Sequence, residues 1–329
     1  KEELVRRNND FNVQFIFADT RTMQKDTPYI NPNAVLGSPE EIDAVNAKQL
    51  TSFRDENFTA KNFAICISGG ISYFKAKKLA RKYFISQLKP TPDDYEVDRS
   101  LHNLVNKEGN LNIETFNFKK TIGRITIKLD DELSVDENIG TLNILCSALN
   151  GISGIYHKLL RDAGLVYGGT YASAFISSKP YKLAFSFECS PENVNKIIDK
   201  ISELFRDLRT KKLDEKLIND VKRSQKLRDD EGSIVAYCNA RNIFQRYHTF
   251  LDKIFDKKWD KKLEKLFDKT SSEDILNLCK KILSKPENIY VTLLTNPDKT
   301  DFYSYEKIQN LLINGKRSKT KKTAPKEAK

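Results

Sequence analysis

The stretch from Gly151 to Cys189, GISGIYHKLLRDAGLVYGGTYASAFISSKPYKLAFSFEC, places a short helix, a glycine turn and two β-rich runs almost without spacer. A helical spacing of apolar residues in IYHKLL stops at Gly164, and glycine readily takes the left-handed conformation that ends helices. Leu165 to Ile176 and Tyr181 to Phe187 are rich in β-branched and aromatic residues. The stretch therefore predicts a helix followed by a β-hairpin that starts at Leu165 and buries one face.

Arg161 ends this helix, and Tyr167 follows early in the first expected strand. A tight turn would bring a guanidinium and a phenol to the same end of the sheet, which suits a peptide carboxylate or carbonyl. Gly168 and Gly169 leave the strand backbone open to another chain. In the alternative interpretation, Arg161 only complements the helix dipole and Tyr167 covers the sheet.

The run LLRDAGLVYGG, the two strands, CSPENV and the helix that follows resemble the C-terminal part of the pitrilysin/insulysin family of zinc metallopeptidases, which includes the mitochondrial processing peptidases. In that family an Arg and a Tyr in the half without zinc contact the bound peptide. The resemblance assigns these roles to Arg161 and Tyr167. The expected substrate-binding residues are therefore Arg161, Tyr167, Gly168 and Gly169.

An earlier block, VLGSPEEIDAVNAKQLTSFRDENFTAKNFAICISGGI, resembles the same family. Ser38 and Asn46 begin two capping boxes, so two short helices are expected to adjoin, with Leu50 and Phe53 on the buried side. The apolar run from Asn62 to Ser68 predicts a central strand buried on both faces. A broad apolar stripe then predicts a helix from Tyr73 to about Leu88.

The remaining elements follow from the same signals. We expect the chain to begin with the end of a helix (Lys1–Asn9) and strands at Ile113–Phe118, Arg124–Leu129 and Ile289–Leu294. The expected helices are Ile139–Leu149, one that starts at Ser190-Pro191, Lys212–Asp230, Ser233–Phe250, and one capped by Ser272 that runs to Leu283.

The 329 residues exceed the usual size of a single core. The order of elements, like the resemblance, indicates an α+β fold with mixed, mostly antiparallel sheets backed by helices. We expect a truncated first domain and one complete second domain. The expected parts are the C-terminal part of a first domain (1–90), a linker (91–108), the second domain (109–313) and a basic disordered tail (314–329).

The formal net charge is +11, but residues 315–329 hold seven Lys or Arg against one Glu. The remaining charge is interleaved along amphipathic helices and resembles no nucleic-acid-binding module. No apolar run approaches the 18 or so residues of a membrane helix. Nucleic acid and a membrane span are therefore not expected, and the sequence does not indicate a compartment.

Metal-binding residues show no recognisable pattern. The three histidines form no HxxEH motif, and the five cysteines are far apart, which indicates buried thiols rather than a zinc site or a disulfide framework: Cys66, Cys146, Cys189, Cys238 and Cys279. No catalytic or metal-ligating residue is therefore assigned in this chain. In the resembled family a zinc-bound water and a Glu on the zinc helix hydrolyse the peptide, and the resemblance begins downstream of that helix.

The sequence thus predicts the non-catalytic, substrate-clamping portion of a pitrilysin-like zinc metalloendopeptidase. Its expected partners are a peptide substrate and a zinc-bearing half or subunit of the same family, and zinc would belong to that half. This chain alone is expected to be inactive. The alternatives are a catalytically dead scaffold or interaction subunit of the same fold and, with less support, a basic nucleic-acid-binding protein.

Overall fold

A computed structural model describes residues 2–24, 37–60, 63, 65–90, 108–130, 133, 135–176, 180–234, 257–298 and 301–315. Nearly all of the expected linker at 91–108, most of the helix expected at 233–250 and nearly all of the tail at 314–329 lie outside these residues. Of the helices that the structure describes, none combines the length and hydropathy that a bilayer span requires.

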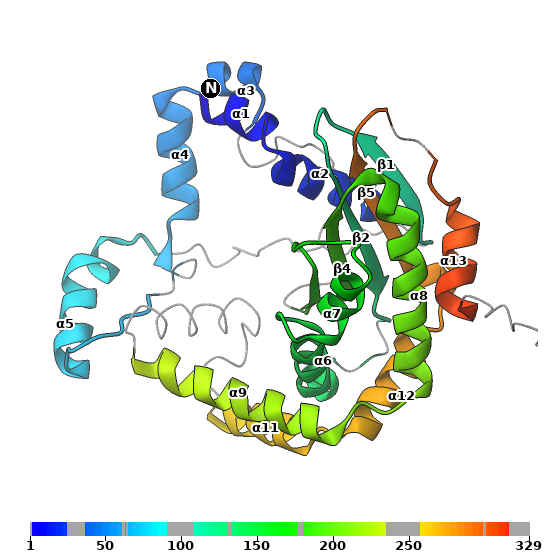
Figure 1. Cartoon of the computed structure of the whole chain (residues 1–329). Helices are drawn as coiled ribbons and strands as arrows, with labels where there is room; N and C mark the ends of the chain where they lie inside the picture. The colour runs from blue at the N-terminus through cyan, green and yellow to red at the C-terminus, as the bar shows by residue number, and fades with distance from the viewer. Residues whose placement is uncertain are drawn as a thin grey trace, which may run out of the picture.

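A five-stranded sheet forms the centre of the fold (Figure 1). Its strands lie in the order β1-β5-β2-β4-β3, with the bounds β1 Leu111–Thr115, β2 Thr121–Lys128, β3 Tyr171–Phe175, β4 Lys182–Cys189 and β5 Ile289–Thr295. The β1–β5 pair is parallel and every other pair is antiparallel. The mixed, mostly antiparallel α+β fold is therefore confirmed, as is the β3–β4 hairpin.

One face of this sheet carries the main core. Alternate side chains of β2, β4 and β5 are fully buried there, as period-two alternation requires: Ile125, Ile127, Leu183, Phe185, Val291 and Leu293. They pack against α6 (Val135–Leu149), α7 (Ile155–Asp162), α8 (Val194–Thr210) and α12 (Ser272–Ile282). The ring centroids of Phe185 and Phe205 lie 4.9 Å apart.

The predicted apolar stripe of α8 is buried throughout: Val194, Ile197, Ile198, Ile201, Leu204, Phe205 and Leu208. Its last turn carries Arg209, whose guanidinium donates to the carbonyl oxygens of Leu283, Leu312 and Ile313 at 2.6–2.8 Å. Arg209 thus joins α8 to the ends of α12 and α13 (Tyr305–Asn314). The remaining helices are α9 (Glu215–Ile234) and α11 (Lys257–Lys269). We call the described residues from 108 to 315 the sheet domain.

The opposite face of the sheet receives the helix α2 (Phe11–Met23), and α1 (Glu2–Asn8) precedes and contacts α2. Asp10 caps α2, which packs on β5 and β1. The Arg124 guanidinium reaches the Asp19 carboxylate at 2.6 Å, and the Thr292 hydroxyl donates to the same carboxylate at 3.2 Å. This contact combines these polar pairs with a small apolar cluster of Phe15, Ile122 and Leu294, whereas the core on the other face is large and apolar.

Residues 37–60, 63 and 65–90, which we call the arm, hold α3 (Pro39–Ala44), α4 (Ala47–Asn57) and α5 (Tyr73–Tyr83). Figure 1 shows α4 and α5 apart from the sheet and its helices. Both predicted capping boxes are confirmed, at Ser38 and at Asn46. The arm also exposes large apolar side chains: Val45, Leu50, Phe53, Phe58, Phe63, Ile65, Ile67, Tyr73, Phe74, Leu79, Tyr83, Phe84 and Ile85.

Two expectations about the arm are wrong. Leu50 and Phe53 are each 61% exposed rather than buried. The run expected to be a central strand pairs with no strand within the described residues, and Ile65 and Ile67 remain exposed. The run has the composition of a central strand, but a strand also needs neighbours on both sides, and the described part of the chain supplies none.

Candidate functional site

The turn that follows α7 forms as predicted. Gly164 has a φ of +66°, and the Leu165 N–H donates to the Leu160 carbonyl at 3.0 Å. This left-handed closure is the common way to satisfy the last carbonyls of a helix. Leu160 and Leu165 are both buried, so an apolar contact accompanies the turn.

The first strand of the hairpin begins later than expected, at Tyr171 instead of Leu165. Gly169 takes a φ of +72°, which interrupts an extended strand, and a Cβ placed on it would lie 2.7 Å from the Glu188 Cβ. The segment 165–170 therefore leaves the sheet at the end of β4 instead of pairing with it. A single left-handed glycine inside a β-rich run is hard to recognise in a sequence.

This departure opens a hollow of about 530 Å³ between residues 164–169 and the end of β4. Tyr167, Gly168 and Gly169 line it, together with Lys120, Glu188, Cys189 and Asn193. Arg161 lies exposed on the last turn of α7, before the chain reverses at Gly164, and does not line the hollow. The structure thus brings three of the four predicted site residues to one hollow.

Tyr167 is 102% exposed, so its ring does not cover the sheet. Neither Tyr167 nor Arg161 makes a side-chain hydrogen bond or ion pair with the described residues. The sheet-covering alternative for Tyr167 is therefore wrong.

The backbone of residues 166–169 is also unpaired. Within the described residues it makes no backbone hydrogen bond. The segment is nevertheless fixed at both ends. The Asn193 amide donates to the Leu165 carbonyl at 3.4 Å, and His157 Nδ1 lies 2.6 Å from Thr170 Oγ1. Four consecutive residues thus offer free main-chain donors and acceptors from an anchored position.

The edge of β3, in contrast, is closed by α6. The Asn150 side chain accepts from the Ala172 N–H at 2.8 Å and donates to the Ala172 carbonyl at 2.7 Å. The Asn150 side chain therefore takes the place of a neighbouring strand at Ala172. Another chain cannot pair with β3 at Ala172 unless α6 moves.

The hollow carries an ion pair and a buried thiol. Lys120 Nζ lies 2.5 Å from Glu188 Oε1, which gives its rim one charge of each sign. Burial, with smaller contributions from the Glu192 and Glu188 carboxylates, raises the pKa of the Cys189 thiol to about 12. A thiol that stays protonated at neutral pH is a poor nucleophile.

Zinc does not fit the described residues either. No group of three or more His, Cys, Asp and Glu side chains among them could hold a metal ion. Of the histidines, only His157 falls inside the described ranges, and its Nδ1 faces Thr170. We derive no step of hydrolysis from this part of the chain.

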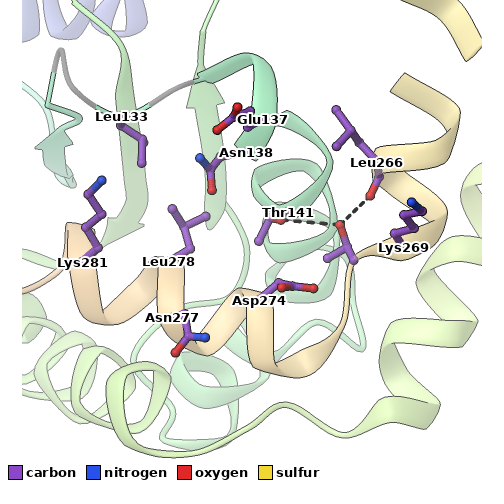
Figure 2. Close-up of a pocket in the computed structure, with 11 residues that line it drawn as sticks. Leu133, Glu137, Asn138, Thr141, Leu266, Lys269, Asp274, Asn277, Leu278 and Lys281 are labelled. Atoms are coloured by element: carbon purple, nitrogen blue, oxygen red, sulfur yellow. Dashed lines mark hydrogen bonds between the residues drawn. The ribbon is translucent and has the colours of Figure 1, made fainter. Parts of the chain in front are cut away.

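A second hollow, of about 410 Å³, lies between α6, α11 and α12 (Figure 2). Its polar groups serve the helices that form it. The Asp274 carboxylate caps α12 by accepting from Ser271, and the Thr270 hydroxyl donates to the Leu266 carbonyl at 2.9 Å and lies 3.5 Å from the Thr141 hydroxyl. Helix ends account for these contacts, so we assign no site there.

The family of the chain is shown by its sequence. The profile of the Peptidase M16 inactive domain matches residues 44–225, more than half of the chain. The chain therefore belongs to peptidase family M16, and the matched region is the inactive domain of that family. This confirms the resemblance to the C-terminal part of the pitrilysin-like peptidases. A comparison with curated protein sequences gave no match.

Solved structures share the fold. The peptidase M16 inactive domain from Pseudomonas fluorescens has a TM-score of 0.68 at 13% identity, covering 91% of this chain and 69% of that one. A putative M16-like peptidase from Alicyclobacillus acidocaldarius has a TM-score of 0.68 at 16% identity, with 89% and 68% covered. A chain of Complex III2 from Candida albicans has a TM-score of 0.71 at 11% identity, with 94% and 72% covered.

Several residues of the hollow were not predicted. Lys120 and Glu188 lie 68 positions apart and meet only because Thr121 and Cys189 are partners in the β2–β4 register. Asn150, which lies at the edge of β3 and not in the hollow, had one weak sequence signal, an amide directly before a glycine at a helix end. Pairings across a sheet depend on strand order, which one sequence does not specify.

Proposed function

We propose that this chain is the substrate-clamping portion of a pitrilysin-like zinc metalloendopeptidase and holds an extended peptide at residues 166–169. The observation that carries the proposal is the unpaired, anchored backbone of this segment beside the fully exposed Tyr167. A peptide chain gains affinity from main-chain hydrogen bonds to such a segment. Gly168 has no side chain that would keep the peptide away. The space beside it is also open, since a Cβ placed there would meet nothing within 4 Å.

In this proposal Arg161 and Tyr167 bind the same peptide through their side chains. Arg161 supplies charge-assisted donors from the last turn of α7, and Tyr167 supplies its hydroxyl. Their freedom from internal contacts supports this role, because a side chain with no partner in the fold is available to a ligand. The closed edge of β3 directs the peptide to residues 166–169.

Hydrolysis would be carried out by a zinc-bearing half or subunit, since the described residues form no zinc site. The arm supports the existence of such a partner. Its exposed aromatic side chains, such as Phe74 (82% exposed) and Phe53 (61% exposed), form an apolar surface of the kind that marks protein contacts. In this proposal the arm is the C-terminal part of a first domain that the partner half completes.

A binding titration tests the proposal. The probe is a fluorescein-labelled ten-residue peptide of Ala, Ser and Leu with blocked ends, titrated with the 329-residue chain. Arg161→Ala and Tyr167→Phe should each weaken binding by about 1–3 kcal/mol, typical of a lost hydrogen bond to a charged or buried partner. Their melting temperatures should stay unchanged, because neither side chain contributes to the core.

Arg223→Ala is the matched control, since Arg223 is an exposed arginine of α9 outside the site. It should leave both affinity and stability unchanged. Unchanged peptide affinity in the Arg161 and Tyr167 variants would contradict the clamp. The alternative would then stand, in which the chain is a scaffold or interaction subunit of the same fold.

A further inference from the structure

The outer face of the β3–β4 hairpin begins beside the hollow, because Glu188 and Cys189 at the end of β4 line the hollow. Its side chains alternate with those of the core and therefore share one face: Tyr171, Ser173 and Phe175 on β3, and Lys182, Ala184 and Ser186 on β4. We call these six residues the outer strip. Tyr171 is 57% exposed and Phe175 is 38% exposed, so the strip is open to solvent along β3.

The far end of the strip carries an ammonium group with no anionic contact. Lys182 Nζ has one hydrogen-bond acceptor among the described residues, the Met23 thioether sulfur at 3.7 Å, and it lies 5.1 Å from the centre of the Phe175 ring. Thioether sulfur is a weak acceptor. Burial lowers the pKa of Lys182 below its ordinary value, and the neighbouring Arg124 guanidinium acts in the same direction.

The surrounding charges leave this end positive. Lys128 of β2 stands directly opposite Lys182 in the register, and Arg124 lies on the same face. Among the described residues the carboxylate that acts on Lys182 is Asp19, whose two oxygens already accept from Arg124 and Thr292. A half-buried cation without an ion pair of its own is costly, and residues that break this rule often bind ligands.

We propose that Lys182 forms a subsite for a carboxylate of the bound peptide, at the end of the outer strip away from the hollow. This inference rests on the proposed function, because the peptide that fills the subsite is the one held at residues 166–169. The Phe175 ring beside the ammonium provides an apolar wall for the side chain that carries the carboxylate.

The length of the strip determines which residue of the bound peptide would reach Lys182. Gly169 and Phe175 are six residues apart, so at about 3.3 Å per residue the strip spans about 20 Å. An extended peptide bound at the hollow would therefore place its sixth residue or so near Lys182. The carboxylate belongs either to an acidic side chain at that position or to the C-terminus of a peptide that ends there.

Peptide pairs test the subsite on the full chain. The neutral ten-residue probe is made with a single Glu near its first or its last residue, and each Glu peptide is compared with its Gln counterpart, all with blocked ends. A further pair compares a free C-terminal carboxylate with a C-terminal amide, which distinguishes the two sources. We expect one of the charged peptides to bind about five- to tenfold more tightly than its neutral counterpart.

Lys182→Met should remove this preference without weakening the neutral peptide. Lys196→Met is the matched control, because Lys196 is an exposed lysine of α8 on the other side of the sheet, and it should retain the preference. Tyr167→Phe should weaken charged and neutral peptides equally. Melting temperatures of all variants check the fold. If Lys182→Met fails to fold, the comparison of charged and neutral peptides on the unaltered chain decides alone.

Two results would overturn the subsite, namely equal affinity of all charged and neutral pairs, or a preference that survives Lys182→Met. If the neutral peptide still depends on Tyr167 in either case, the clamp stands and only the subsite fails. If no peptide binds at all, the clamp fails and the subsite fails with it.

Discussion

The sheet domain and the arm contain the same kinds of side chain in opposite surroundings. Phe185 and Phe205 are fully buried in the sheet domain, whereas Phe74 is 82% exposed in the arm. Ser271 and Ser38 both begin helices with complete capping boxes, one in each region. Local signals therefore operate equally in both regions, and the difference lies in the supply of neighbours. The sheet domain, with α2 on its second face, buries its large apolar side chains, while the arm leaves many of its own exposed.

Alkaline pH should produce the largest difference between the two regions. Burial raises the pKa of Cys146, Cys189 and Cys279, all in the sheet domain, to about 12. Between about pH 9 and pH 12 the unfolded chain loses these protons while the folded domain retains them, so the free energy of unfolding falls with pH. Each thiol contributes about 1.4 kcal/mol per pH unit, and the three together about 4.

Urea unfolding at several alkaline pH values measures this slope. Cys279→Ala should reduce the slope by about a third, even if it also lowers stability at neutral pH. Cys66→Ala, in the arm, is the control and should leave the slope as it was. A profile that stays flat up to pH 11 would contradict the burial of the three thiols.

Phenylalanine truncation compares the two regions directly. Phe185→Ala should lower the free energy of unfolding by about 3–5 kcal/mol, because it leaves a cavity in a closely packed core. Phe74→Ala should change it by less than about 0.5 kcal/mol, since its ring is already in water. Chemical denaturation of both variants checks the contrast. A large loss of stability in Phe74→Ala would mean that the arm packs on itself or on the sheet domain in solution.

Arginine removal should give a smaller contrast. Arg209→Leu leaves three carbonyl oxygens at the ends of α12 and α13 without their donor, and we expect a loss of about 1.5–3 kcal/mol. Arg54→Leu, in the arm, removes an exposed pair with Asp55 and should cause no measurable change in the melting temperature. Equal effects of the two substitutions would show that the hydrogen bonds of Arg209 do not stabilise the fold.

The two serine caps should give the smallest contrast. Ser271→Ala removes the side-chain cap of α12 and should cost about 1 kcal/mol of the stability of the sheet domain. Ser38→Ala should leave global unfolding unchanged and loosen only α3, which has no buried residues. Amide hydrogen exchange distinguishes a loss of global stability from a loss of protection confined to α3. A global loss of protection in Ser38→Ala would tie the arm to the main folding unit.

The sequence predicted those features that depend on neighbours along the chain. The buried stripe of α8, the capping boxes of α3 and α4 and the left-handed Gly164 are all confirmed. Some local features were placed imprecisely or missed. The N-cap of α12 is Ser271, one residue earlier than expected, and helices α11 and α13 were not predicted.

The two larger errors also arose because the structure of each segment depends on residues far away in the sequence. The run Asn62–Ser68 was expected to be a strand because of its composition, but a strand needs neighbours that its own sequence does not contain. The strand expected at Leu165 begins at Tyr171, because Gly169 must approach Glu188. For the site, the sequence located Tyr167, Gly168 and Gly169 at the hollow, while Lys120 and Glu188 required the β2–β4 register.

The amide of Asn150 has a consequence for self-association. An exposed sheet edge is a template on which further strands, including those of other copies, add without limit. By engaging both backbone groups of Ala172, Asn150 ends the sheet with one uncharged side chain. Polymerisation through this edge is thereby suppressed, even though the adjoining segment keeps its main chain free. Copies of this chain can in this way stay separate at this edge even at high concentration.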